Sequence, residues 1–425
     1  MAKKASVRDV RRSNRALLLR RLLLAGETSR SDLGADTGLS PATVTSVVSE
    51  LIEEGTVTET GFLDSAGGRR RVLLRVDHGS AFVLGADVSE TQVTTALFGL
   101  TLDRLAQRAT PFPGRRIDPS RVGEILATHV AELLAQTGVE ASRIIGLGLG
   151  VPGVVEHPAT PDAIVHADVI GWDTATFTWL ERTLGLPVLV DNGAKTTTQA
   201  EAWYGSATGV EHAIVALIGD GAGAGIITNG RLYRGASSSA GEWGHTKISL
   251  DGPACRCGSA GCVEAIVGAS AVLRDWRGRD EYTGREPEGV DALLAAHRNG
   301  DEAAQRAMAA AIAHLGLALA NLVNLYNPEK IIVGGWFGDL IIRDHPQELS
   351  AAVRRFSLKQ PGEQAVVERS RLGADAVALG AATLPVDHFI ESGLVPDRRL
   401  ISSRPREDSQ SATRALRAPA ATAGA

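Results

Sequence analysis

Apolar positions recur at helical spacing in the first 55 residues of the chain. The run at residues 14–25 predicts an amphipathic helix that ends at Gly26, a residue typical of helix C-termini. N-capping side chains crowd residues 28–33 and predict a second helix, which stops at the turn 37–39. A third helix is predicted directly after this turn. Two helices joined by a short glycine-containing turn are typical of a helix-turn-helix.

The third helix is the candidate element for contacting DNA. Ser40 is its predicted N-cap and Pro41 its first helical residue, where a missing N–H costs nothing. Its predicted buried face is Val44, Val47, Val48 and Leu51. Short hydroxyl side chains near its N-terminal half can reach phosphates and base edges in a major groove. The residues expected to do so are Ser40, Thr43, Thr45 and Ser46.

Two strands around a loop are predicted for residues 55–76, as a wing beside the third helix. Three consecutive arginines, Arg69, Arg70 and Arg71, lie at its tip or on its second strand, where they can enter a minor groove or clamp phosphate. The alternative is an ordinary helical subdomain with a solvated charge run. Residues 1–75 carry a net charge of +4 and the remainder carries −9. This asymmetry favours an anionic partner for the N-terminal residues, which we call the head. We expect residues 1–76 to be a winged helix-turn-helix domain that binds double-stranded DNA.

After residue 80, short apolar strands alternate with helical segments, which predicts an α/β fold. Two strands, at residues 144–153 and 212–219, lead into glycine-rich turns. We expect a first lobe over residues 80–210, a second lobe over residues 211–395, and a disordered tail over residues 400–425, where Ser, Arg, Ala, Thr and Gly dominate. The other predicted strands are 81–87, 92–98, 104–110, 187–191 and 329–335, and the predicted helices are 120–136, 194–204, 303–325 and 374–382.

Composition limits the class of protein. A chain of 425 residues with 44% hydrophobic content has room for two or three domains with ample cores. We expect no membrane span, because there is no apolar run of about 18 residues. We expect no secretory signal, because the N-terminus leads into charged residues. Cysteines that act as thiolate ligands fit a reducing cytosol, so a cytoplasmic location is expected.

The chain has three cysteines, and all of them lie within eight residues. Nine residues separate them from His245, and Gly258 and Gly261 lie between them, where glycine lets the backbone turn. Three thiolates and one imidazole make a tetrahedral zinc set. The alternative is three buried cysteines and a core histidine. We expect one structural Zn²⁺ per chain, because four protein ligands leave no open position for water; the ligands are His245, Cys255, Cys257 and Cys262.

Two carboxylates flank this set. Glu242 precedes His245 by three residues, and Glu264 follows Cys262 by two. Paired carboxylates on a rigid loop suit bidentate hydrogen bonding to neighbouring sugar hydroxyls. Equally, they could support the metal site or face solvent, and the residues alone leave both readings open.

Together these motifs resemble those of the ROK family (repressors, open reading frames and kinases), in its regulator branch. Residues 148–153 resemble its GxGxPG turn, residues 240–245 its AGExGH motif, and residues 255–264 its CxCGxxGCxE motif. The likeness spans residues 10–390 and implies an actin-like, ribonuclease-H-like duplicated fold with sugar bound between the halves. It implies the same four zinc ligands, and sugar contacts from Asn192, Glu242, His245 and Glu264.

The chain departs from the family's kinases at the reacting positions. Kinases carry Asn-Asp at the start of one helix, and this Asp is the general base; here Gly193 follows Asn192 and cannot accept a proton. The first phosphate-binding loop has the pattern DxGxT in kinases, and here it contains Ser89 and Glu90. The second, glycine-rich phosphate-binding loop contains Asp220 here. Carboxylates are unfavourable in such a loop, because they repel a phosphate group, which needs hydrogen-bond donors around it. We therefore predict no ATP-dependent sugar phosphorylation.

The combined prediction is a sugar-responsive transcriptional regulator, a repressor as the resemblance implies, which acts as a homodimer or a dimer of dimers. A dimer is expected because paired heads contact half-sites about one helical turn apart. The alternative is a bifunctional ATP-dependent sugar kinase that carries a DNA-binding domain.

Overall fold

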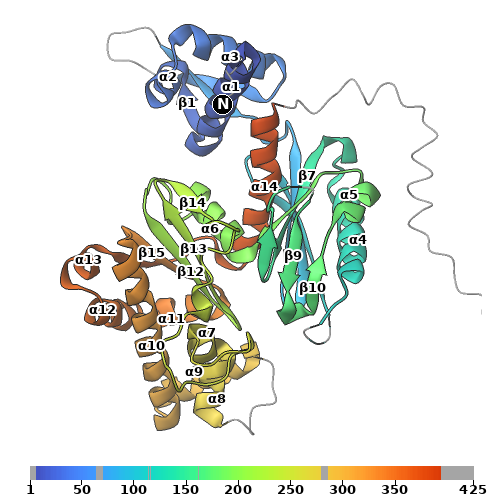
Figure 1. Ribbon diagram of the computed structural model, residues 1–425. Helices are drawn as coiled ribbons and strands as arrows, with labels where there is room; N and C mark the ends of the chain where they lie inside the picture. Colours follow the sequence, from blue (N-terminus) through green and yellow to red (C-terminus); the bar gives the residue numbers. More distant parts are fainter. Residues whose placement is uncertain are drawn as a thin grey trace, which may run out of the picture.

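The computed structural model describes residues 6–63, 70–112, 114, 116–160, 162–278 and 286–393 (Figure 1). Its N-terminal part holds three helices and a three-stranded antiparallel sheet with strand order β1-β3-β2. The predicted helices and strands are present, and the short β1 is an additional element. The bounds are α1 (Val7–Ala25), β1 (Glu27–Ser29), α2 (Arg30–Thr37), α3 (Pro41–Glu53), β2 (Val57–Leu63) and β3 (Arg71–Val76).

Local side chains fix where α2 and α3 begin and end. Ser29 caps α2 by accepting a backbone N–H three residues on, and Gly38 ends this helix in the left-handed conformation, with a φ of 69°. Ser40 caps α3 in the same way, and Pro41 opens its first turn, as predicted. The apolar face predicted for α3 is buried at all four positions, Val44, Val47, Val48 and Leu51.

Two five-stranded sheets with matching strand order form the body of the molecule. In each, three consecutive strands make an antiparallel meander, a fourth strand pairs in parallel with the first, and a fifth pairs in parallel with the fourth. The orders are β11-β7-β4-β5-β6 and, read in the equivalent direction, β16-β15-β12-β13-β14. This repeat confirms the predicted duplicated α/β fold. The strands are β4 (Phe82–Val88), β5 (Gln92–Gly99), β6 (Arg104–Pro111), β7 (Ile144–Val151), β11 (Val188–Asn192), β12 (Ala213–Ile218), β13 (Ala222–Thr228), β14 (Arg231–Tyr233), β15 (Lys330–Gly334) and β16 (Val366–Arg369).

Helices and a small sheet complete the two halves. A three-stranded sheet of β8 (Val154–Glu156), β9 (Ile164–Ala167) and β10 (Trp172–Ala175) follows β7. The helices are α4 (Pro119–Thr137), α5 (Thr178–Leu184), α6 (Gly193–Tyr204), α7 (Val263–Val267), α8 (Ala269–Arg277), α9 (Glu286–Arg298), α10 (Glu302–Tyr326), α11 (Trp336–Asp344), α12 (Pro346–Phe356), α13 (Lys359–Gln364) and α14 (Ala376–Ser392). The short 3₁₀ turns are η1 (Ala141–Arg143), η2 (Asp168–Ile170), η3 (Trp243–His245) and η4 (Gly373–Asp375).

The last helix, α14, returns to the first half of the body. It packs against β4, β7 and α6, beside the first sheet in Figure 1. Glycines in the strands permit this approach, because a Cβ on Gly148 would lie 1.8 Å from the carbonyl oxygen of Ala381, and one on Gly85 would lie 2.0 Å from that of Ala378. The range expected for the second lobe, residues 211–395, thus includes a helix that completes the first. The tail expected over residues 400–425 lies outside the described residues.

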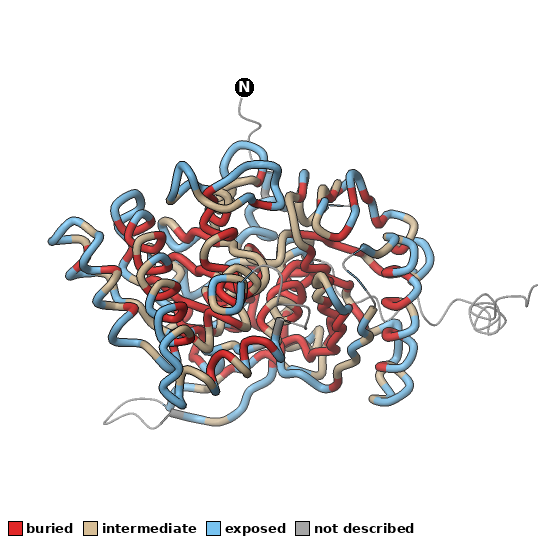
Figure 2. Tube along the Cα trace, turned by 90° about the horizontal axis from the view of Figure 1, so that it is seen from below, coloured by how far each residue is buried: buried red, intermediate tan, exposed pale blue. Residues whose placement is uncertain are grey.

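One apolar cluster joins the N-terminal part to the body. Leu18 and Leu22 of α1 belong to the same buried cluster as Trp203 of α6 and Phe389 of α14. Buried positions continue through the centre of the molecule, and exposed positions lie mainly at its periphery (Figure 2). The N-terminal part therefore rests on α14 through a packed interface as well as through the short connection after β3.

The long helix α10 is apolar and long enough to cross a membrane by length and composition alone. Its side chains, however, contribute to the core of the second half, where Met308, Leu315 and Leu319 are buried. This burial is typical of a core helix in a folded domain.

Candidate functional site

A cleft of 1160 Å³ lies between the two halves of the body. The turn between β4 and β5 lines it from the first half, and the equivalent turn between β12 and β13 lines it from the second. The first turn of α6 and the segment from η3 to α7 also line it. All four residues predicted to contact sugar line this cleft: Asn192, Glu242, His245 and Glu264. The fold therefore brings them together, while their contact with a sugar stays a prediction.

Four side chains beside the cleft form a cluster that could hold a metal ion. The ligand atoms of His245, Cys255, Cys257 and Cys262 all lie within 4.8 Å of one another. The sulfurs of Cys257 and Cys262 are 3.7 Å apart, as are the sulfur of Cys255 and Nδ1 of His245. An ion bound tetrahedrally at about 2.3 Å from each sulfur separates two sulfurs by about 3.8 Å, so these distances fit a four-coordinate site.

The backbone around the cluster depends on its glycines. Gly258 and Gly261 have φ angles of 86° and 68°, which L side chains rarely adopt. A Cβ on Gly261 would also lie 1.7 Å from the carbonyl oxygen of Ser249. Nζ of Lys247 lies 2.8 Å from the sulfur of Cys262. The turns predicted from these glycines are therefore present.

Asn192 has a structural task at the start of α6. Its Oδ1 caps the helix by accepting the N–H groups of Ala194 and Lys195, at 2.9 and 3.2 Å. Its Nδ2 donates to the carbonyl oxygen of Gly153, at 2.6 Å. Asn192 thus ties the GxGxPG turn to α6, and only part of its amide group remains for a ligand.

Glu264 lies against Arg256, which stands between two of the cysteines. Nε and Nη2 of Arg256 lie 2.7 and 3.1 Å from the two carboxylate oxygens of Glu264, and the N–H of Ala222 donates to the same carboxylate at 3.1 Å. This guanidinium, together with these hydrogen bonds, holds the pKa of Glu264 below its usual range despite burial. A sugar hydroxyl that donates to Glu264 would share a carboxylate that is already engaged.

Glu242 is paired with a buried lysine. Nζ of Lys195, on the first turn of α6, lies 3.9 Å from Oε1 of Glu242. Burial raises the pKa of Glu242 and lowers the pKa of Lys195, and each charge partly offsets the effect on the other. Only 1% of Lys195 is exposed, so this ammonium depends on nearby carboxylates, first Glu242, which lines the cleft, and then Asp191.

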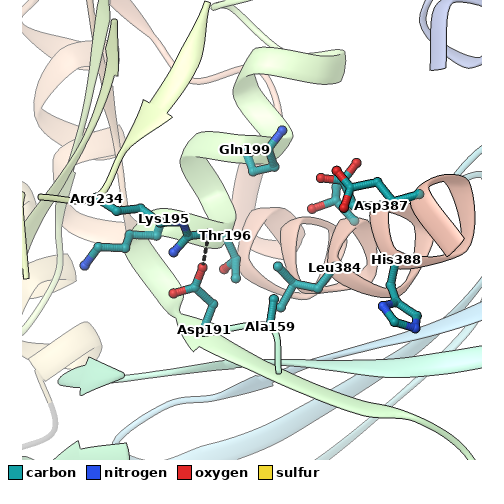
Figure 3. Close-up of a pocket in the computed structure, with 11 residues that line it drawn as sticks. Ala159, Asp191, Lys195, Thr196, Gln199, Arg234, Leu384, Asp387 and His388 are labelled. Atoms are coloured by element: carbon teal, nitrogen blue, oxygen red, sulfur yellow. Dashed lines mark ion pairs between the residues drawn. The ribbon is translucent and has the colours of Figure 1, made fainter. Parts of the chain in front are cut away.

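A second, smaller cavity of 130 Å³ lies near the start of α6 (Figure 3). Asp191, Lys195 and Gln199 line it from β11 and α6, and Asp387 and His388 line it from α14. Nη2 of Arg234 lies 2.7 Å from Oδ2 of the buried Asp191, which ties the segment after β14 to the end of β11. Lys195 thus lines this cavity and also pairs with Glu242 of the larger cleft.

The same end of α14 is joined to α1 by ion pairs. Nη1 of Arg20 lies 2.7 Å from Oδ1 of Asp387, and its Nη2 lies 3.6 Å from Glu391. The guanidinium of Arg20 also lies 5.6 Å from the ring centroid of Trp203 on α6. One arginine of the N-terminal part therefore contacts both helices that frame the small cavity.

The ROK family model matches residues 83–387. The chain belongs to the ROK family. The xylose repressor of Bacillus subtilis (strain 168) is 29% identical over 386 residues, which cover 90% of this chain and 97% of the repressor. A crystal structure of a ROK family transcriptional regulator, a homologue of the E. coli MLC protein, matches with a TM-score of 0.73 at 24% identity and covers 91% of this chain and 98% of its own. At that identity the match establishes a shared fold.

A ROK hexokinase from Thermus thermophilus is similar too, with a TM-score of 0.60 and 30% identity over 71% of this chain and 97% of the hexokinase. In this ROK chain, Gly193 is the first residue of α6, so no carboxylate stands at the position predicted for a catalytic base. Ser89 and Glu90 lie in the β4–β5 turn and Asp220 lies in the β12–β13 turn, and all three line the cleft.

The residues predicted to contact DNA lie on α3 and β3 or beside them. Thr45 and Ser46 are exposed on α3, whereas Ser40 and Thr43 are engaged in its cap, with their hydroxyl oxygens 2.9 Å apart. Arg71 begins β3, and its Nη1 lies 2.9 Å from Asp32 of α2. Arg70 directly precedes this strand and is exposed. Arg69 lies outside the described residues.

Sequence reasoning missed the charged residues that connect these sites. Lys195 follows Asn192 within the first turn of a helix, and Arg256 separates two predicted metal ligands. Both positions could have been noted as charged residues next to a predicted site. Nothing in the sequence near Arg20 or Asp387 indicates that they pair, because only the folded chain brings α1 to α14.

Proposed function

We propose that this ROK protein is a sugar-responsive transcriptional repressor without kinase activity. Residues 1–76 would act as a winged helix-turn-helix that binds double-stranded DNA, and the cleft would bind a sugar or a sugar derivative. The similarity to a xylose repressor over 90% of this chain supports this function. The observation that carries it is the docking of α1 on α14, because this contact gives the sugar-binding body a route to the DNA-binding head.

The α3 surface suits a DNA duplex. Its N-terminal half presents exposed hydroxyls at Thr45 and Ser46, and basic residues stand at the start of β3. A symmetric dimer would place two such helices on neighbouring half-sites, so we propose a homodimer or a dimer of dimers that acts in the cytoplasm.

The metal cluster supports a structural Zn²⁺, since its donor set of one imidazole and three thiolates is closed to a water ligand. Zinc held by His245, Cys255, Cys257 and Cys262 would fix the segment that carries Glu242 and Glu264. The residues proposed to contact the sugar are Asn192, Glu242, His245 and Glu264.

A sugar can alter DNA affinity only if it binds two conformations of the protein unequally. We propose that the sugar engages Glu242, which shifts the Lys195 pair and thereby α6 and α14, on which the head rests. Gel-shift titration of the purified protein, with and without xylose, glucose, fructose and N-acetylglucosamine, tests this function. Sequence-preferring DNA binding that one sugar changes is the expected result, and its absence under all conditions would refute the proposal.

The second candidate, a sugar kinase that also binds DNA, is favoured by the similarity to the hexokinase. It predicts ADP release with one of these sugars. Gly193 opposes it, since no side chain there can take the proton from a sugar hydroxyl. A Cβ at this position would meet Val377 at 3.5 Å, so a side chain fits. We expect Gly193→Asp to remain inactive, because both phosphate turns still carry acidic residues; turnover in the wild-type protein would establish the kinase.

A further inference from the structure

Arg256 connects the two halves of the body across the cleft. Its Nη1 lies 2.6 Å from Oε1 of Glu90, which stands on the β4–β5 turn of the first half. Its Nε and Nη2 hold the carboxylate of Glu264, on the first turn of α7 in the second half. The side chains of Glu90 and Glu264 are 13% and 8% exposed, so water screens these ion pairs only in part.

The same guanidinium covers the equivalent turn of the second half. A Cβ on Gly221, in the β12–β13 turn, would lie 2.6 Å from Nη2 of Arg256 and 3.0 Å from Oε2 of Glu264. The N–H of Ala222, at the end of this turn, donates to Glu264. An anionic ligand at this turn would need its backbone N–H donors and an open approach to Gly221. Glu264 already accepts the N–H of Ala222, and Arg256 already covers Gly221.

We propose that Glu90, Arg256 and Glu264 form a latch that holds the two halves of the cleft together without a nucleotide. A guanidinium that binds one carboxylate with two nitrogens and a second with its third nitrogen has its donors directed to both sides of the cleft. Without it, two carboxylates face each other in a poorly screened place, and their repulsion favours opening. Glu90 lies between β4 and β5 of the first sheet and Arg256 lies between β14 and α7 of the second half, so this is a contact between halves.

The latch also offers a way for a bound sugar to change the spacing of the two halves of the cleft. This part of the inference rests on the proposed function. A sugar hydroxyl that donates to Glu264 competes with Arg256 for the same carboxylate oxygens. Effector binding would then weaken the Arg256–Glu264 contact and alter how the first half is held through Glu90. The Arg256 latch thus links ligand occupancy to the spacing of the two halves.

Hydrogen exchange of the full-length, metal-loaded protein without sugar or nucleotide tests the latch. We expect Glu90→Gln to speed exchange of the amides at residues 88–92 by about three- to tenfold, because the turn opens more often. Arg256→Gln should do the same, and the double variant should exchange no faster than either single variant, because both changes break one latch. Glu124→Gln is the matched control, since Glu124 pairs with Arg121 on the exposed face of α4.

Glu90→Gln is the decisive variant, because Glu90 is remote in sequence from the metal ligands and metal content should stay unchanged. Unaltered exchange at residues 88–92 in Glu90→Gln, or additive effects in the double variant, would overturn the latch. This readout needs neither sugar nor DNA, so it separates the two proposals. If sugars release DNA but Glu90→Gln leaves amide exchange at residues 88–92 unchanged, the proposed function stands and the latch is refuted. If Glu90→Gln speeds this exchange but no sugar changes DNA binding, the latch stands and the proposed function is refuted.

Discussion

Nη1 of Arg20 on α1 lies 2.7 Å from Oδ1 of Asp387 on α14, which joins the N-terminal head to the helix that closes the first half of the body. We expect Arg20→Gln to reduce the effect of the sugar on DNA affinity by about fivefold. The free energy that couples two binding sites is commonly no larger than that of a single ion pair, so the loss of this pair should remove much of the coupling. The measurement is the ratio of DNA dissociation constants with and without sugar. Arg21→Gln is the matched control, because Arg21 pairs with Asp36 inside the head. Equal loss of coupling in both variants would contradict this role of Arg20.

A carboxylate on the exposed face of α3 should weaken DNA binding. We expect Thr45→Glu to lower DNA affinity by about tenfold or more at low salt, because the added charge faces the phosphates. Fluorescence anisotropy with a labelled operator fragment measures the change. Thr128→Glu adds the same charge to an exposed position of α4 in the body and should leave affinity within about twofold. Similar losses in the two variants would show that net charge, and not α3, is responsible.

Removal of one thiolate should release the metal. We expect Cys257→Ser to lower the zinc content from about one ion per chain and to reduce the sugar affinity by about tenfold, because the segment that carries Glu242 and Glu264 loses its anchor. Elemental analysis and calorimetric titration with the sugar measure the two effects. Ser259→Ala, in the same loop, should retain the metal. A wild-type protein purified without zinc supplementation or chelator that contains no zinc would be incompatible with the site.

The pair of Glu242 and Lys195 should serve both folding and ligand binding. We expect Glu242→Gln to reduce the free energy of unfolding by about 1 kcal/mol, since the buried Lys195 loses one of two nearby carboxylates and solvent screens the partly exposed Glu242. It should also abolish detectable sugar binding. Lys195→Met combined with Glu242→Gln should recover thermal stability and leave sugar binding absent. Recovery of binding in the double variant would mean that Glu242 acts only through the fold.

Asp87, at the end of β4, should make stability depend on pH. Burial raises the pKa of Asp87 from its ordinary value to about 7. The folded state therefore holds this proton where the unfolded state has released it, and stability falls as pH rises from about 4 to about 7. We expect the melting temperature of Asp87→Asn, relative to wild type, to rise steadily between pH 5 and pH 7.5. Asp173→Asn, at an exposed position, is the control, and parallel curves for all three proteins would contradict the assignment.

Short-range patterns predicted much of the fold. The caps at Ser40 and Gly38, the apolar face of α3, and the alternation of strands and helices all depend on neighbours within a few residues, and the structure contains each of them. Several helices that follow the metal segment, α8, α9, α11, α12 and α13, were not predicted, and α14 is longer than expected. In α8, α11 and α12 the buried apolar residues recur at helical spacing, so the local pattern was present in the sequence and was missed.

By itself, the sequence determined which residues can meet at the metal cluster. His245 and the three cysteines lie within 18 residues, so a short loop closes the set at little entropic cost. Only the tertiary structure decided that Asn192 donates to Gly153, that Arg256 joins Glu90 to Glu264, and that α14 belongs to the first half and carries the head. These contacts join segments far apart in the chain. Their formation depends on the order in which strands assemble into sheets, a property of the whole packed molecule and not of any local run of residues.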